Sequence, residues 1–176
     1  MPTIIVRSET PADVPGTAGI VRQAFGRDDA MLLLEALRKT EDFVPRLSMV
    51  AEVQKGQPVG YALFLRVACS DGKTSYPSAH LYPLAVLPQH QKQGIGERLV
   101  RSGLEHCRAL DIDLVFVTSA PEFFSRMGFQ PARPMNFETN LKVSEQAFQV
   151  LDLTGKLLGK TRGLVSFGRP FLETLS

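Results

Sequence analysis

The sequence has few residues of the kinds that build metal centres or disulfide frameworks. Its 176 residues include only two cysteines, Cys69 and Cys107, and three histidines. Because the cysteines are scattered and have no metal-ligand neighbours, we expect two free, mostly buried thiols in a reducing compartment. So few histidines and cysteines give no ligand set, and no metal is expected.

Long apolar runs and a charge excess are missing as well. No apolar run approaches the ~18 residues of a membrane span, and the first residues, MPTIIVRSETPAD, lack the apolar core of a signal peptide. The formal net charge of +2 is too small to argue for nucleic acid, and no run of Lys or Arg stands out. We therefore expect a soluble cytoplasmic protein that binds neither membrane nor nucleic acid.

The composition that is present is ordinary for a globular protein. Hydrophobic residues make up 44% and charged residues 22% of the chain, and this length allows a core without disulfide or metal staples. The chain has no internal repeat, low-complexity tract or linker. These features favour a single domain that spans residues 1–176.

The most informative stretch runs from Leu81 to Gly96, with the sequence LYPLAVLPQHQKQGIG. An apolar run at its start predicts a buried strand, which Pro88 should end because proline cannot donate to a sheet ladder. From Ile95 onward, apolar residues recur at spacings of three and four, which indicates an amphipathic helix. A glycine loop that opens a helix leaves backbone N–H groups without internal partners. With the helix dipole behind them, these groups suit a phosphate.

Strand and helix patterns alternate around this central stretch. We expect helices at residues 11–25, 28–38, 95–110 and 120–127, and further strands at residues 3–7, 47–53, 58–69, 111–118 and 147–153. A further strand or turn should begin at Phe129. Residues 131–145 and the tail from Thr154 have weak periodicity. The order predicts an α/β (mixed α+β) fold, in which a mixed sheet carries helices on both faces.

At the glycine loop the chain resembles a known family. Gln91-x-x-Gly94-x-Gly96 fits the Q/R-x-x-G-x-G/A signature of the GNAT superfamily, the coenzyme A-dependent N-acetyltransferases. The later segment FFSRMGF, residues 123–129, resembles the family's F-Y-x-x-x-G-F segment. The resemblance covers about residues 3–132. Within the family, the chain is most similar to small stand-alone bacterial proteins that are predicted acetyltransferases. Residues 133–176 would then be a C-terminal strand plus a subfamily tail.

The resemblance implies a fold and a cosubstrate. The fold would be a mostly antiparallel sheet of about six or seven strands with a splayed central strand pair. The cosubstrate would be acetyl-CoA, whose pantetheine arm pairs with the free edge of the central strand and whose pyrophosphate binds the loop amides. A Cβ at Gly94 or Gly96 would obstruct the phosphate oxygens. The implied cofactor-binding residues are Leu84, Ala85, Val86, Gln91, Lys92, Gln93, Gly94, Ile95, Gly96, Glu97, Ser119, Phe123 and Arg126.

Plainer interpretations of the same residues stay open. The glycine loop could be a structural turn without a ligand, and Lys92 could be a solvated side chain rather than a phosphate contact. Phe123, Phe124 and Phe129 could belong to the core rather than to a site, because hydrophobic packing alone explains them.

Acetyl transfer to an amine needs a base and a way to release the thiolate. We predict His80 as the base, because it lies four residues before Leu84, where histone-modifying relatives carry an acidic base, and its unperturbed pKa near 6.5 suits this role. His80 could equally have no catalytic role, and Glu52 is a lesser candidate. His90 and His106 are expected on a loop and on a helix surface.

The family's usual proton donor is missing. Relatives carry a Tyr four residues before the Gly of the Gly-Phe pair, whereas this chain has Phe124 there. Ser119, Ser125 and Tyr82 are alternative donors, and a thiolate with a pKa of about 8.5 is also a tolerable leaving group at neutral pH.

Two functions follow from these patterns. The first is an acyltransferase that moves the acetyl group of acetyl-CoA to a primary amine of a small molecule, peptide or protein by direct attack. The second is an acyl-CoA-binding or partner-binding module that keeps the cofactor site with little or no turnover. An ATP site is disfavoured, because the chain has no G-x-x-x-x-G-K-S/T element. The sequence does not identify the acceptor, and it fits a monomer or a homodimer.

Overall fold

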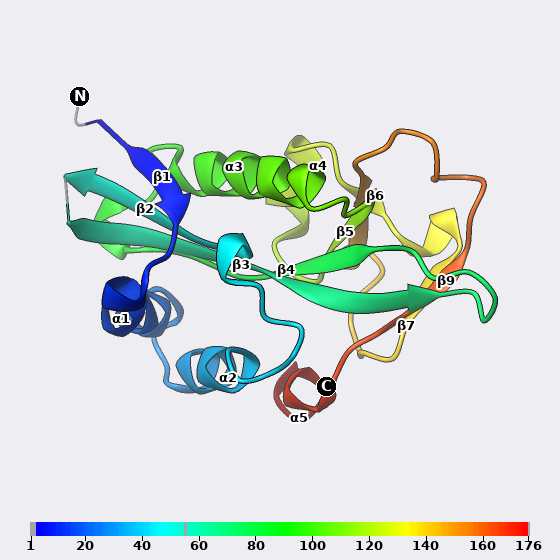
Figure 1. Ribbon diagram of the computed structural model, residues 1–176, viewed down its shortest axis with the longest axis horizontal. Helices are drawn as coiled ribbons and strands as arrows, with labels where there is room; N and C mark the ends of the chain where they lie inside the picture. Colours follow the sequence, from blue (N-terminus) through cyan, green and yellow to red (C-terminus); the bar gives the residue numbers. More distant parts are fainter. Residues whose placement is uncertain (1–2, 55, 176) are drawn as a thin grey trace. The chain divides into compact units, whose positions relative to one another are not determined.

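Strands and helices alternate along the chain in the computed structural model, which describes residues 3–54 and 56–175 (Figure 1). The strands are β1 (Ile5–Ser8), β2 (Ser48–Gln54), β3 (Gln57–Ser70), β4 (Ser78–Val86), β5 (Leu114–Val117), β6 (Gln130–Pro131), β7 (Phe137–Thr139), β8 (Gln149–Asp152) and β9 (Gly163–Ser166). The helices are α1 (Val14–Phe25), α2 (Asp29–Leu37), α3 (Ile95–Ala109), α4 (Pro121–Arg126) and α5 (Arg169–Leu175).

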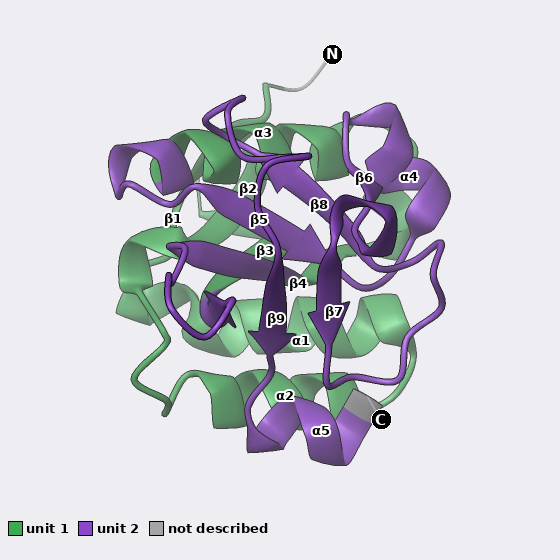
Figure 2. Cartoon of the chain, turned by 90° about the vertical axis from the view of Figure 1, so that its right-hand side faces the viewer, with its two compact units in different colours: residues 1–65, 82–106 green, residues 66–81, 107–176 purple. Residues whose placement is uncertain are grey.

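The chain divides into two compact units (Figure 2). Unit 1 comprises residues 1–65 and 82–106, and unit 2 comprises residues 66–81 and 107–176. The elements β3, β4 and α3 each contribute residues to both units.

In unit 1, antiparallel strands carry helices on both faces. β1 pairs with β2, and β2 pairs with the first part of β3. α3 covers one face of these strands, whereas α1 and α2 cover the other (Figure 1). Burial on both sides explains why β2 and β3 read as nearly continuous apolar runs.

Glycine allows α3 to pack closely on β3. A Cβ at Gly103 would lie 2.0 Å from Cε2 of Phe64, and a Cβ at Gly60 would lie 2.9 Å from Cδ1 of Leu99. Any larger residue at either position would overlap its neighbour in a packed interior. These contacts fix the distance between α3 and the sheet, and so they position the loop that opens the helix.

A buried ion pair joins the other helices of unit 1 to the strands. Arg38 donates to Glu9 through Nη1 to Oε2 at 2.6 Å and through Nη2 to Oε1 at 2.8 Å. Ser48 and Thr17 also donate to Glu9, and the hydroxyls of Ser48 and Tyr61 lie 2.6 Å apart. Burial alone would raise the pKa of Glu9, but the hydrogen bonds from Arg38, Ser48 and Thr17 lower it below its usual value. The carboxylate is therefore held ionised between α1, α2, β2 and β3.

Unit 2 is built around β5. The start of β4 pairs with β5 in parallel, at Ser78–His80 against Leu114–Phe116, and β8 pairs with the other edge of β5 in antiparallel orientation. β6 adds to β8, and β9 pairs with both the end of β3 and with β7. Three phenylalanines form the centre, with ring centroids of Phe116 lying 5.4 Å from Phe137 and 5.8 Å from Phe148.

The predicted fold class is confirmed, because most strand pairs are antiparallel and helices accompany the sheet. The described residues form nine strands rather than six or seven. β6 lies where a strand or turn was expected after Phe129. The additional strands β7 and β9 have 3 and 4 residues, and a segment this short shows no periodicity by itself. β5 also begins later than expected, at Leu114, because Asp111 closes the turn after α3 with a φ of 58°.

No helix within residues 3–54 and 56–175 combines the length and the apolar character that crossing a bilayer requires.

Candidate functional site

In unit 1, the end of β4 leads directly into the glycine loop. Leu84 and Val86 are half-buried and Ala85 is buried. The side-chain amide of Gln91 donates to the carbonyl oxygen of Val86 at 3.0 Å, which closes the loop back onto the strand. The predicted β4 and loop residues are therefore neighbours in one unit.

The loop conformation exposes the start of α3. Lys92 and Gly94 have positive φ values of 60° and 82°, so the chain reverses tightly before the helix. Ile95 is 1% exposed and anchors the first turn in the core, while Gln91, Lys92, Gln93 and Gly94 are exposed. The first internal helix bond runs from the Arg98 N–H to the Gly94 carbonyl oxygen at 3.1 Å. Helix geometry leaves the amides that precede Arg98 in the first turn without intrahelical partners, so they can donate to an anion.

Charged side chains around the helix start favour an anion overall. Lys92 and Arg98 are exposed cations. The only carboxylate of the first turn, Glu97, accepts hydrogen bonds from Arg101 at 2.7 and 3.0 Å, which offsets its charge. Arg98 was not among the residues predicted from sequence, because the glycine signature does not specify a cation at that position.

In unit 2, three predicted residues follow the end of β5. Ser119 and Arg126 are exposed and Phe123 is half-buried. Ala120 has a φ of 48°, which turns the chain from β5 into α4. The buried side chain of Gln149 donates to the Pro121 carbonyl oxygen at 2.9 Å and so holds the beginning of α4.

Phe124 belongs to the core of unit 2. Its side chain is 1% exposed, and its ring lies 5.0 Å from that of Phe123 and 5.2 Å from that of Phe129. The residue at the family's tyrosine position therefore packs as a hydrophobe. Of the alternative donors, Tyr82 is 7% exposed, and burial raises the pKa of its phenol. Ser125 donates to Gln149 at 3.3 Å.

His80 is completely buried in unit 2. Its Nε2 lies 3.0 Å from Oγ1 of Thr118, and its ring meets the rings of Phe167 and Phe171 edge-on at 4.7 and 4.9 Å. Burial lowers the pKa of His80 to about 3, so the imidazole is neutral at physiological pH. The sequence did not indicate this enclosure, because Phe167 and Phe171 come from the tail with weak periodicity.

The other titratable candidates have structural partners. Glu52 accepts from Arg7 at 3.3 Å and from the Gly56 N–H at 3.0 Å. His106 lies on the surface of α3, as predicted, with Nδ1 3.0 Å from the Arg46 carbonyl oxygen. Cys69 and Cys107 are free and buried, also as predicted. In the described parts of the chain, no three His, Cys, Asp or Glu side chains gather as metal ligands would.

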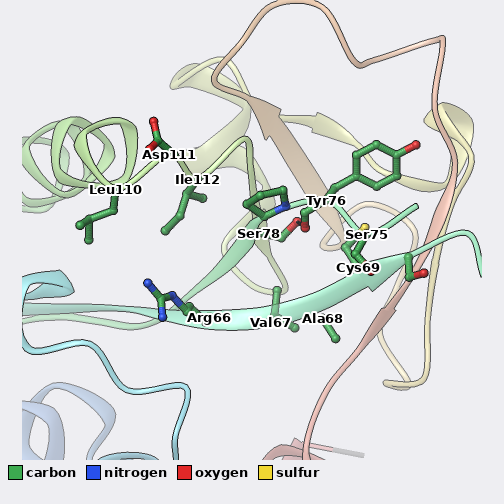
Figure 3. Close-up of a pocket in the computed structure, with 12 residues that line it drawn as sticks. Arg66, Val67, Ala68, Cys69, Ser75, Tyr76, Ser78, Leu110, Asp111 and Ile112 are labelled. Atoms are coloured by element: carbon green, nitrogen blue, oxygen red, sulfur yellow. Dashed lines mark hydrogen bonds between the residues drawn. The ribbon is translucent and has the colours of Figure 1, made fainter. Parts of the chain in front are cut away.

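A separate cavity of about 550 Å³ lies in unit 2, and none of the predicted site residues lines it (Figure 3). The end of β3, residues 75–78 and residues 110–112 surround it. The thiol of Cys69 borders this space, but burial raises its pKa to about 11, so it is not a nucleophile at neutral pH.

Comparison with known families and proteins gives matches that include the end of β4 and the glycine loop. Residues 45–131 match the model of the acetyltransferase (GNAT) domain. The uncharacterized N-acetyltransferase YhbS of Escherichia coli K12 is 30% identical over 168 residues, which cover 96% of this chain and 98% of YhbS. The uncharacterized N-acetyltransferase YjhQ of the same organism is 36% identical over 121 residues, which cover 68% of this chain and 66% of YjhQ.

Solved structures show the same fold. The crystal structure of E. coli YhbS in complex with CoA superposes with a TM-score of 0.88 at 28% identity, covering 97% of this chain and 93% of YhbS. A GNAT family acetyltransferase from Brucella melitensis in complex with acetyl-CoA superposes with a TM-score of 0.76 at 24% identity, covering 97% and 99%.

Proposed function

Because the chain belongs to the GNAT family of N-acetyltransferases and is thus an acyltransferase, we propose that it transfers the acetyl group of acetyl-CoA to a primary amine by direct attack. The observation that carries this proposal is the continuous segment in unit 1 that runs from the end of β4 through the glycine loop into the first turns of α3 and offers backbone donors to an anion. The similar protein YhbS has been solved with CoA. The amine belongs to a small molecule, a peptide or a protein.

Each part of the segment from the end of β4 to the start of α3 binds a different part of the cosubstrate. The main-chain groups of Leu84–Val86 hold the pantetheine arm, and the amides of Gln91–Glu97 hold the pyrophosphate. Lys92 adds a charge-assisted contact from the exposed side of the loop. That Ser119, Phe123 and Arg126 of unit 2 also contact the cosubstrate stays a prediction.

The reaction requires one proton to move. The amine nitrogen attacks the thioester carbonyl carbon, the C–S bond breaks, and CoA leaves as a thiolate. Backbone N–H groups of β4 stabilise the negative charge that develops on the carbonyl oxygen. The attacking amine loses one proton, which His80 accepts as the proposed base, and this proton then goes to the thiolate. A buried imidazole can accept it only if the enclosure of His80 changes during the cycle.

A calorimetric titration with acetyl-CoA tests the proposal. We expect binding by the unmodified chain and at least tenfold weaker binding by Gly94→Val, because a side chain there meets both a positive φ and the phosphate. Gly72→Val is the matched control. Gly72 also has a positive φ, and a Cβ at either glycine meets no atom within 4 Å, but Gly72 lies in a hairpin of unit 2. Absence of binding at millimolar acetyl-CoA, or equal weakening by both variants, would refute the assignment of this loop.

Phe124 favours a second candidate, a module that binds acyl-CoA with little or no turnover. The residue cannot donate a proton and is packed as core. An assay of thiol release against a panel of amines, peptides and proteins separates the two functions. Acetyl-CoA binding without thiol release above background would support the module, whereas release that depends on the amine would exclude it.

A further inference from the structure

The C-terminal residues of unit 2 enclose the imidazole of His80. Phe167 and Phe171 both meet its ring edge-on, and their own centroids lie 5.6 Å apart. The exposed fractions are 0% for His80, 4% for Phe167 and 2% for Phe171. These two rings therefore shield His80 from water.

The two phenylalanines are held in different ways. The N–H of Phe167 donates to Oδ1 of Asn140 at 2.8 Å, and its carbonyl oxygen accepts from Nδ2 of the same side chain at 3.1 Å. Phe167 also directly follows β9, which is paired on both edges. Phe167 is thus held by two bonds from its main chain to the side chain of Asn140 and by its place at the end of a paired strand.

Phe171 lies beyond a glycine, on a short terminal helix. Gly168 separates β9 and Phe167 from α5, and its carbonyl oxygen accepts from the N–H groups of Phe171 and Leu172, both at 3.2 Å. α5 has only 7 residues, which is too short for a helix to be stable without packing. Nε of Arg169 lies 2.9 Å from Oε1 of Glu173, and the exposed fractions of these two side chains are 89% and 64%. An ion pair this exposed adds little to the stability of α5 on the rest of unit 2.

We propose that α5 is a hinged cover over His80, which lifts at Gly168 to withdraw Phe171, and that His80 takes up a proton only in the lifted state. Protonation of His80 in the lifted state rests on the proposed function, in which one proton passes from the amine nitrogen to the imidazole and then to the thiolate. The hinge itself does not depend on that function. Local opening of a terminal element requires less free energy than global unfolding, which makes such a cover feasible.

Modification of the full-length chain with diethyl pyrocarbonate tests the cover, because this reagent acylates accessible neutral imidazoles. Peptide mass spectrometry follows His80, with His90 and His106 as internal references. In the unmodified chain we expect His80 to react much more slowly than His90. Phe171→Ala should accelerate modification of His80 by more than about 100-fold, because the typical cost of losing a buried phenylalanine corresponds to at least that factor in an opening equilibrium. It should leave His90 and His106 unchanged.

Hydrogen exchange distinguishes a hinge from general unfolding. In Phe171→Ala, the α5 amides should exchange faster by the same factor as His80 reacts, whereas the Val115 amide in β5 should keep its protection. Leu164→Ala, on β9 and 47% exposed, is the control and should change neither rate. Phe171→Leu is a milder variant, with an expected acceleration of about tenfold, should the alanine variant not fold.

Several results would overturn the cover. His80 reacting as fast as His90 in the unmodified chain would show that it is not enclosed. Faster α5 exchange without faster modification of His80 would show that α5 does not limit access. Equal loss of protection at Val115 would show global unfolding instead of a hinge. These measurements need no acetyl-CoA. Failure of the chain to bind acetyl-CoA would therefore refute the proposed function and leave the proposed hinge untouched.

Discussion

At the scale of single residues, burial decides what His80 can do. An exposed histidine titrates near pH 6.5, which is why the sequence suggested a base. Enclosure by Phe167 and Phe171 lowers the pKa of His80 to about 3, since the charged form would lose its hydration. Residue type therefore indicated the chemistry, but only the three-dimensional neighbours determine the protonation state.

This lowered pKa has a measurable effect on stability. Between pH 6.5 and pH 3 the unfolded chain binds a proton at His80 that the folded chain does not, so the free energy of unfolding falls as pH decreases. We expect His80 to account for a loss of about 2 kcal/mol between pH 7.5 and pH 5. The lowered carboxylate pKa values of Glu9 and Asp13 add their losses at lower pH.

Urea unfolding at several pH values measures this effect. The His80→Gln variant cannot titrate at this position, so its free energy of unfolding should vary less over the same range, by the same ~2 kcal/mol. Comparing the two chains removes the contributions of His90 and His106, which both retain. Identical pH profiles would mean that His80 is accessible to protons in the folded state.

At the scale of elements, local patterns predicted most of unit 1. The helices α2 and α3 lie within one residue of their expected bounds, and α1 ends as expected but begins three residues later, at Val14. Each has an amphipathic pattern and a clear stop such as Gly26, with a φ of 70°. The loop from Gln91 to Gly96 was predicted for the same reason, since strand, glycines and helix adjoin in sequence. β7, β9 and α5 were not predicted, because their stability comes from pairing and packing with residues far away in the chain.

The same substitution, Gly→Ala, should change stability in opposite directions at two helix positions, one of which faces β3. Gly103→Ala would place a Cβ 2.0 Å from the buried ring of Phe64, so we expect a loss of about 2 to 3 kcal/mol of stability. Gly19→Ala in α1 meets no atom within 4 Å, so we expect a gain of about 0.5 to 1 kcal/mol from helix propensity. Urea midpoints of the two variants measure both. A stable Gly103→Ala variant would contradict the close approach of α3 to β3.

At the scale of the whole molecule, the sequence predicted one domain, and the structure divides into two units. Continuity of the chain gives a reason to expect one folding unit. Because β3, β4 and α3 each have residues in both units, disorder in either unit would interrupt strands or a helix of the other. A single domain therefore stays our prediction, and we expect it to unfold in one cooperative transition.

Native-state hydrogen exchange of the Gly103→Ala variant tests this cooperativity, because the substitution and its partner Phe64 lie in unit 1. If the units unfold together, a loss of about 2 kcal/mol should accelerate the slowest amides of β2 in unit 1 and of β5 in unit 2 equally, by roughly 30-fold. Gly19→Ala should slow both sets by a common, smaller factor. Acceleration confined to β2, with β5 unaffected, would show that the units unfold independently and that the chain comprises two domains.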